Sequence, residues 1–149
     1  MGMFTAFNIN ASGLTAQRYR MDIISENVAN ANTTRTEDGT PYRRKVVTFE
    51  EKGAGISFGS VFKTARNRYT GNGVKVSVVH EDTWSEMKMV YDPSHPDADE
   101  NGYVLYPNVN IITEMTNLID ASRSYEANST AFTASKSIAM KGLQVGQSS

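Results

Sequence analysis

The sequence predicts a mainly α-helical fold with a small β-rich insert. Near each end of the 149-residue chain, apolar residues recur at steps of three and four, the spacing of a helix that packs against another helix. Between the ends the period shortens to two, which is typical of β-strands. We therefore expect long helices within residues 1–35 and 108–149, forming a coiled-coil-like pair, and a β-rich insert over residues 36–107.

The N-terminal helix is predicted over about residues 8–30. Its apolar seam is expected to contain Leu14, Met21, Ile24 and Val28. Gly13 lies within this helix and costs about 1 kcal/mol relative to alanine, which is tolerable where a neighbouring helix packs closely.

An asparagine-rich stretch containing Asn27, Asn30 and Asn32 follows. Asparagine tolerates the left-handed conformation at a helix end, and its side chain bonds nearby backbone groups. Two interpretations remain open. The stretch is either a polar helix end with its loop, or an ordered asparagine network that bridges subunits.

The insert contains four candidate strands, at residues 44–50, 73–79, 87–91 and 103–106. Residues 52–72, which are rich in Gly, Ser and basic side chains, are expected to form a long loop or a flexible hairpin.

The C-terminal helix is predicted from Asn110 to Val145, since no proline interrupts this stretch. Asn108 and Asn110 can accept hydrogen bonds from the first turn. Its seam is expected to contain Ile111, Met115, Leu118, Tyr125, Phe132 and Leu143. About 35 residues give a rod of roughly 52 Å, whereas a compact globule of this chain length is roughly 38 Å across. Part of the seam should therefore pack against something outside the chain.

Composition excludes several functional classes. Sixteen acidic residues nearly balance fifteen basic ones, which argues against general nucleic-acid binding. Cysteine is absent, and no apolar run approaches the roughly 20 residues of a membrane span. Residues 1–7 carry no basic side chain, so we expect no cleaved secretory signal peptide.

Three motifs suggest chemistry, but each fits its local sequence poorly. Gly55-Ile56-Ser57-Phe58-Gly59 matches a nucleophile elbow without the strand and large sheet that an elbow requires. Residues 97–102 match half of a calcium loop, yet its twelfth position is Asn108 rather than glutamate. His95 lies beside two aspartates. We expect no catalytic residue, no metal and no cofactor. The alternatives are a non-polymerising helical-hairpin binding module and, third, an enzyme that uses Ser57 or His95.

Several stretches together carry a resemblance. They are Asn27-Val28-Ala29-Asn30-Ala31-Asn32-Thr33, Tyr91-Asp92-Pro93, His95-Pro96-Asp97-Ala98, Gly102-Tyr103-Val104, Pro107-Asn108-Val109-Asn110 and Ala121-Ser122-Arg123-Ser124-Tyr125-Glu126-Ala127-Asn128. With these motifs the chain resembles the bacterial flagellar rod and hook proteins, and within them the proximal rod subunits.

The resemblance implies a structural subunit that assembles helically and transmits torque from motor to hook. In that family the two terminal helices form an inner layer and the insert an outer layer, and the terminal segments are disordered before assembly. The implied partners are copies of itself, proximal and distal rod subunits, the adaptor between rod and export gate, and the flagellar type III export apparatus. The implied location is the basal-body rod within the periplasm.

Overall fold

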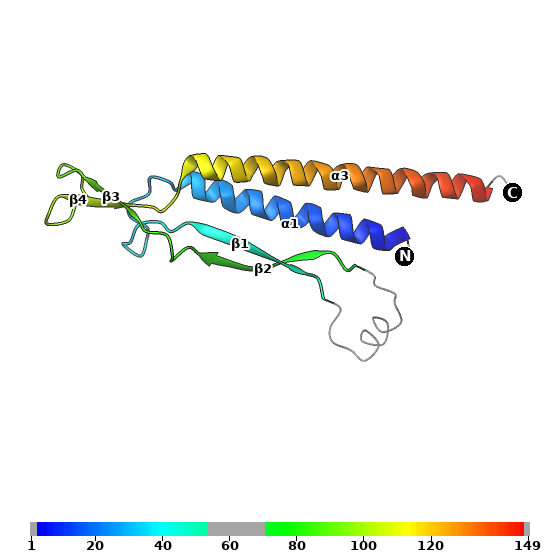
Figure 1. Ribbon diagram of the computed structural model, residues 1–149, viewed down its shortest axis with the longest axis horizontal. Helices are drawn as coiled ribbons and strands as arrows, with labels where there is room; N and C mark the ends of the chain where they lie inside the picture. The colour runs from blue at the N-terminus through cyan, green and yellow to red at the C-terminus, as the bar shows by residue number, and fades with distance from the viewer. Residues whose placement is uncertain (1–2, 54–70, 148–149) are drawn as a thin grey trace. The chain divides into compact units, whose positions relative to one another are not determined.

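The computed structural model describes residues 3–53 and 71–147. Its elements follow in the order α1 (Met3–Ala29), β1 (Lys45–Glu51), β2 (Val74–Glu81), β3 (Lys88–Tyr91), β4 (Tyr103–Tyr106) and α3 (Ile111–Gln147) (Figure 1). This order confirms the predicted fold class, two long helices with a small β insert between them. Most of the predicted loop at residues 52–72, and the whole motif at residues 55–59, lie outside the described residues.

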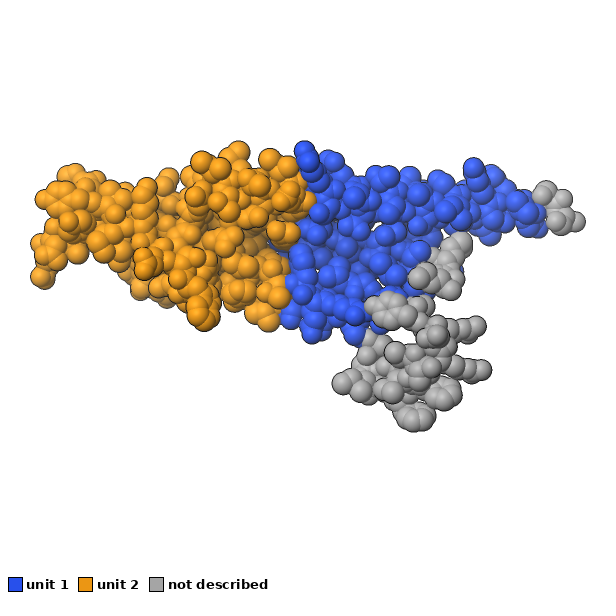
Figure 2. All heavy atoms as spheres, in the orientation of Figure 1, with its two compact units in different colours: residues 1–19, 49–77, 122–149 blue, residues 20–48, 78–121 orange. Residues whose placement is uncertain are grey.

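The chain divides into two compact units (Figure 2). Unit 1 contains Met1–Tyr19, Phe49–Ser77 and Ser122–Ser149, and unit 2 contains Arg20–Thr48 and Val78–Ala121. Each unit therefore combines part of α1, part of α3 and part of the insert.

In unit 1 the helices α1 and α3 run antiparallel. The rings of Phe7 and Phe132 meet edge to face with centroids 5.1 Å apart. Further along α1, a Cβ atom added to Gly13 would lie 2.8 Å from Asn128 Oδ1, so the helices approach closely there. The insert joins this unit through Ser12, whose Oγ accepts a hydrogen bond from the Val74 N–H at 3.0 Å.

Two short sheets complete the fold, and the sheet of β3 and β4 lies wholly in unit 2. The strands β1 and β2 pair in one sheet, and β3 pairs with β4 in the other. The second pair is antiparallel, with Val90 opposite Val104 and Met89 opposite Leu105. Val104 is fully buried and joins Ile24, Ala31 and Ala121 in a small core.

The predicted element boundaries agree with the structure except at the start of α1. The strands begin and end within two residues of their predicted positions. Helix α1 begins at Met3, five residues before the predicted start. The Phe7–Phe132 contact gives the physical reason, since packing against α3 stabilises a turn that lacks helix-start signals of its own.

Candidate assembly site

A buried and fully hydrogen-bonded polar side chain, Asn27, lies at the end of α1. It is 1% exposed. Its Oδ1 accepts hydrogen bonds from the Lys45 N–H at 2.8 Å and the Tyr42 hydroxyl at 2.9 Å. Its Nδ2 donates to the Lys45 carbonyl at 2.9 Å and to Glu114 Oε2 at 3.0 Å. Since an amide offers two donors and two acceptor lone pairs, its capacity is filled.

Glu114, in the first turn of α3, brings a carboxylate into the same buried site. It is also 1% exposed. Arg44 approaches its Oε1 with Nε and Nη2, both at 2.8 Å. A buried carboxylate is stable only when it is paired and hydrogen-bonded, and Arg44 together with Asn27 meets that requirement.

Three further residues extend this network. Asn108 accepts from the Arg44 N–H at 2.9 Å and donates to the Asp82 carbonyl at 2.8 Å. Hydrogen bonds from Ser85 lower the pKa of Asp82, which favours the charged carboxylate near Arg44. Burial raises the pKa of Tyr42 to about 12, and the charges of Glu26, Glu81 and Glu114 add to the effect.

We call this network the polar clamp. It consists of Asn27, Tyr42, Arg44, Asp82, Asn108 and Glu114. It joins the end of α1, the start of β1 and the first turn of α3 within unit 2. The clamp can hold these segments in one arrangement, because its donors and acceptors are occupied by one another or by the neighbouring Lys45 and Ser85.

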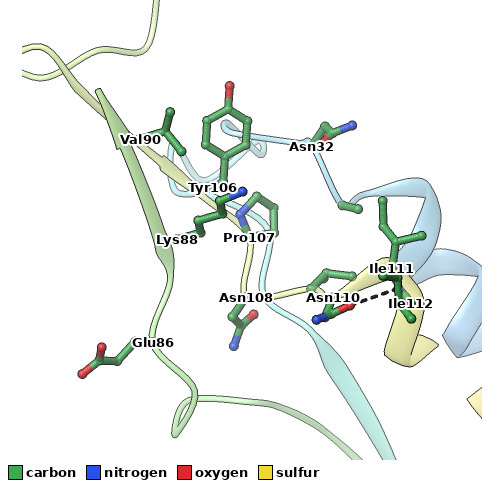
Figure 3. Close-up of a pocket in the computed structure, with 12 residues that line it drawn as sticks. Asn32, Glu86, Lys88, Val90, Tyr106, Pro107, Asn108, Asn110, Ile111 and Ile112 are labelled. Atoms are coloured by element: carbon green, nitrogen blue, oxygen red, sulfur yellow. Dashed lines mark hydrogen bonds between the residues drawn. The ribbon is translucent and has the colours of Figure 1, made fainter. Parts of the chain in front are cut away.

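A groove lies beside the first turn of α3, also in unit 2. It is a cavity of about 790 Å³ with an apolar floor that includes Val90, Tyr106 and Pro107. Figure 3 shows Glu86, Lys88 and Val90 on one side and Ile111 and Ile112 on the other, with Tyr106 and Pro107 between them. The groove therefore combines an apolar surface with one acidic and one basic residue.

The described residues contain neither a group of three or more metal-binding side chains nor a membrane-spanning helix. His, Cys, Asp and Glu side chains do not gather into such a group within the described ranges. Across the same ranges, neither helix is long and apolar enough to cross a membrane.

Both ends of the chain match models of flagellar rod proteins. Residues 7–35 match the family described as "Flagella basal body rod protein". Residues 100–145 match the family described as "Flagellar basal body rod FlgEFG protein C-terminal".

Full-length relatives extend this match over the insert. The flagellar basal-body rod protein FlgC of Bacillus subtilis is 46% identical over 99% of this chain and 100% of that protein. The FlgC of Borreliella burgdorferi is 43% identical over 99% of both chains. The FlgC of Salmonella typhimurium is 41% identical over 99% of this chain and 100% of its own length. The chain belongs to the FlgC family of flagellar basal-body rod proteins.

The matched regions of this FlgC-family chain contain the helical side of the polar clamp. Asn27 lies in the N-terminal match, whereas Asn108 and Glu114 lie in the C-terminal match. Tyr42, Arg44 and Asp82 come from the insert between the two matches. The clamp thus connects both rod-family segments to the insert.

The asparagine-rich stretch of the FlgC-family chain divides between two environments. The Asn27 amide is filled within its own chain. Asn30 donates from Nδ2 to the Glu26 carbonyl at 3.0 Å and accepts from the Thr33 hydroxyl at 3.1 Å, as at a polar helix end. Asn32 is exposed and lines the groove. A bridging role between subunits therefore stays a prediction. Of these asparagines, Asn32 is exposed and could contact a neighbouring subunit.

The predicted seam residues of the FlgC-family chain range from buried to exposed. Ile24 is buried. Leu14, Met21, Val28, Leu118, Tyr125 and Phe132 are half-buried. Ile111, Met115 and Leu143 are exposed. The chain thus covers only part of the predicted seam, and the role of these residues in assembly stays a prediction.

Sequence reasoning missed several exposed apolar residues of α3. Ile112, Met115 and Ile119 form a stripe beside the groove and are 78%, 55% and 53% exposed, yet only Met115 was placed in the seam. Ile112 and Ile119 each follow a predicted seam residue by one position. These residues could have been found from the sequence, because the apolar face of this helix is broader than a seam of alternating three- and four-residue steps.

Proposed function

We propose that this chain, a structural rod subunit of the flagellar basal body, assembles helically with other axial proteins and transmits torque from motor to hook. The observation that carries the proposal is the set of FlgC relatives that match 99% of the chain at 41–46% identity. In this function the chain transmits mechanical load and catalyses no reaction.

The surface of the free chain supports an assembly role. Exposed apolar residues of α3 leave part of a helix face without cover, in units that are otherwise held by buried contacts. Burying one large apolar side chain contributes about 1.5–3 kcal/mol before ordering is counted. Neighbouring subunits can supply that cover, and ordering of the terminal helices then accompanies assembly.

The proposal includes partners and a location. The partners are copies of this chain, the other proximal and distal rod subunits, the adaptor between rod and export gate, and the flagellar type III export apparatus. The location is the rod within the periplasm. The relatives' names, which describe basal-body rod proteins, support the location in the basal body.

A non-polymerising helical-hairpin binding module is the alternative function. Hydrodynamic measurements and circular dichroism on the purified chain separate the two. An assembly subunit shows frayed helix ends and less than the full helix content, whereas a binding module is a compact monomer with both helices complete.

Paired aspartates in the seam test the proposal. Leu118→Asp with Phe132→Asp places charge on two half-buried positions of α3 and should abolish rod incorporation and motility. The matched control is Thr116→Asp with Thr133→Asp, which places the same charges on exposed positions of the same helix. Circular dichroism of the purified variants reports whether they still fold. Normal basal bodies and normal motility in the Leu118/Phe132 variant would contradict the proposal.

A further inference from the structure

We infer that the C-terminal end of α3 from one copy of this chain docks into the groove of a second copy. The docking segment is residues 138–147, which we call the overhang. This inference rests on the proposed function and names the surfaces that would join one copy to the next.

The overhang extends past the start of α1. Phe7 faces Phe132, and Gly13 faces Asn128. Because the helices are antiparallel in this unit, each residue nearer the start of α1 faces one further along α3, which brings Met3 opposite about residues 136–138. The described part of α1 therefore ends where the overhang begins, while α3 continues to Gln147.

The overhang is apolar and accessible. Ile138, Met140 and Leu143 are 71%, 53% and 60% exposed, whereas Ala139 is buried. Lys141 is the charged residue of the segment. An amphipathic helix obtains most of its stability by packing its apolar face, so the exposed side chains of this segment, Ile138, Met140 and Leu143, require cover from outside the chain.

The groove offers a matching surface. Its apolar floor continues into the stripe of Ile112, Met115 and Ile119 on α3. Glu86 can pair with Lys141 of the docked helix, and Lys88 can face the partial negative charge at the helix C-terminus. Both charges at the groove thus have a counterpart on the overhang.

The geometry of a single helix requires two copies. The overhang and Ile112 belong to the same continuous helix, α3, and residues some thirty positions apart in one helix cannot touch. The contact also joins two different surfaces, since the overhang belongs to unit 1 and the groove to unit 2. A contact between unlike surfaces is heterologous and can propagate without closing, which is the type of contact that a rod requires.

Disulfide trapping between single-cysteine variants tests the docking. The natural chain has no cysteine, so Ile112→Cys and Leu143→Cys each provide one thiol, at positions that are already exposed. The two purified full-length variants are mixed and oxidised. We expect a disulfide-linked dimer in the mixture, several-fold above the dimer formed by either variant alone.

The matched control replaces Ile112→Cys with Trp84→Cys. Trp84 is 92% exposed and lies in the same unit, outside the groove lining. A dimer yield equal to this control would overturn the inference. Efficient dimerisation of Leu143→Cys alone would also overturn it, because the overhangs would then pair with each other.

A charge reversal adds a second readout. Lys141→Glu should reduce trapping, and Glu86→Lys on the partner chain should restore it. Rod incorporation of the unaltered chain is measured separately. If the unaltered chain enters the rod but the cysteine variants form no disulfide-linked dimer, the proposed function stands and the docking inference is wrong. If the unaltered chain does not enter the rod, the proposed function is wrong.

Discussion

At the scale of single residues, Asn27 shows why an amide suits the end of α1. Its oxygen accepts from the Lys45 N–H while its nitrogen donates to the Lys45 carbonyl and to Glu114. Aspartate has the same shape but lacks the donors, and alanine lacks both functions. The side chain at this position must both donate and accept hydrogen bonds, because it bonds the Lys45 backbone and the buried Glu114 carboxylate at the same time.

We expect Asn27→Asp to destabilise the chain by about 3 kcal/mol or more, because it removes two hydrogen bonds and places a second carboxylate against Glu114. Urea unfolding followed by circular dichroism measures the change. Asn32→Asp, which makes the same chemical change at an exposed position, should alter stability by less than about 0.5 kcal/mol. Equal effects of the two substitutions would show that the clamp does not stabilise unit 2.

The sequence indicated Asn27 but not its partners. The asparagine-rich stretch predicts the end of a helix from neighbouring residues alone. Glu114 looks like an ordinary acidic residue in the first turn of a helix. It lies 87 positions from Asn27, and its burial depends on a chain reversal through the whole insert, which local patterns do not encode.

At the scale of elements, the period of the apolar residues was sufficient to predict the positions of the strands and of α3. The strand β2 alternates clearly, and α3 contains no proline. The start of α1 was missed because residues 3–7 carry no helix-start signal of their own, yet they lie inside the helix. The packing of Phe7 against Phe132 outweighs that local preference.

The same helix pair approaches closely at Gly13. An added Cβ would press on the side chain of Asn128, whose Nδ2 donates to the Ser124 carbonyl at 2.8 Å. A residue larger than glycine at this position would have to displace the Asn128 side chain, which offsets the helix propensity that it would add.

A double-mutant cycle isolates this contact. In the natural background Gly13→Ala should gain little or lose about 1 kcal/mol, because the helix gain is offset by displacement of Asn128. In an Asn128→Ala background the space is free, and Gly13→Ala should stabilise the chain by up to about 1 kcal/mol. Thermal unfolding of the four proteins gives the coupling energy. A coupling near zero would contradict the close approach of α1 and α3 in unit 1.

At the scale of the whole molecule, stability is unevenly distributed along α3. The start of the helix contains Glu114 and Ala121, which are almost completely buried although exposed apolar residues lie between them, whereas at its end Ala139 is buried and the larger apolar side chains are exposed. Regions with few buried contacts open with a small free energy, and regions around buried networks open with most of the global free energy. We therefore expect the start of α3 to be stably folded and its end to be frayed in the free chain.

Hydrogen–deuterium exchange can measure this difference within a single helix. In the free chain, amides of residues 114–121 should exchange about tenfold or more slowly than amides of residues 138–146. In isolated basal bodies the second segment should become protected, because a neighbouring subunit covers it. The first segment serves as the internal control, since the clamp protects it in both states. Equal protection along α3 in the free chain would mean that the helix end is ordered without a neighbour, and assembly would then have no unpacked surface to complete.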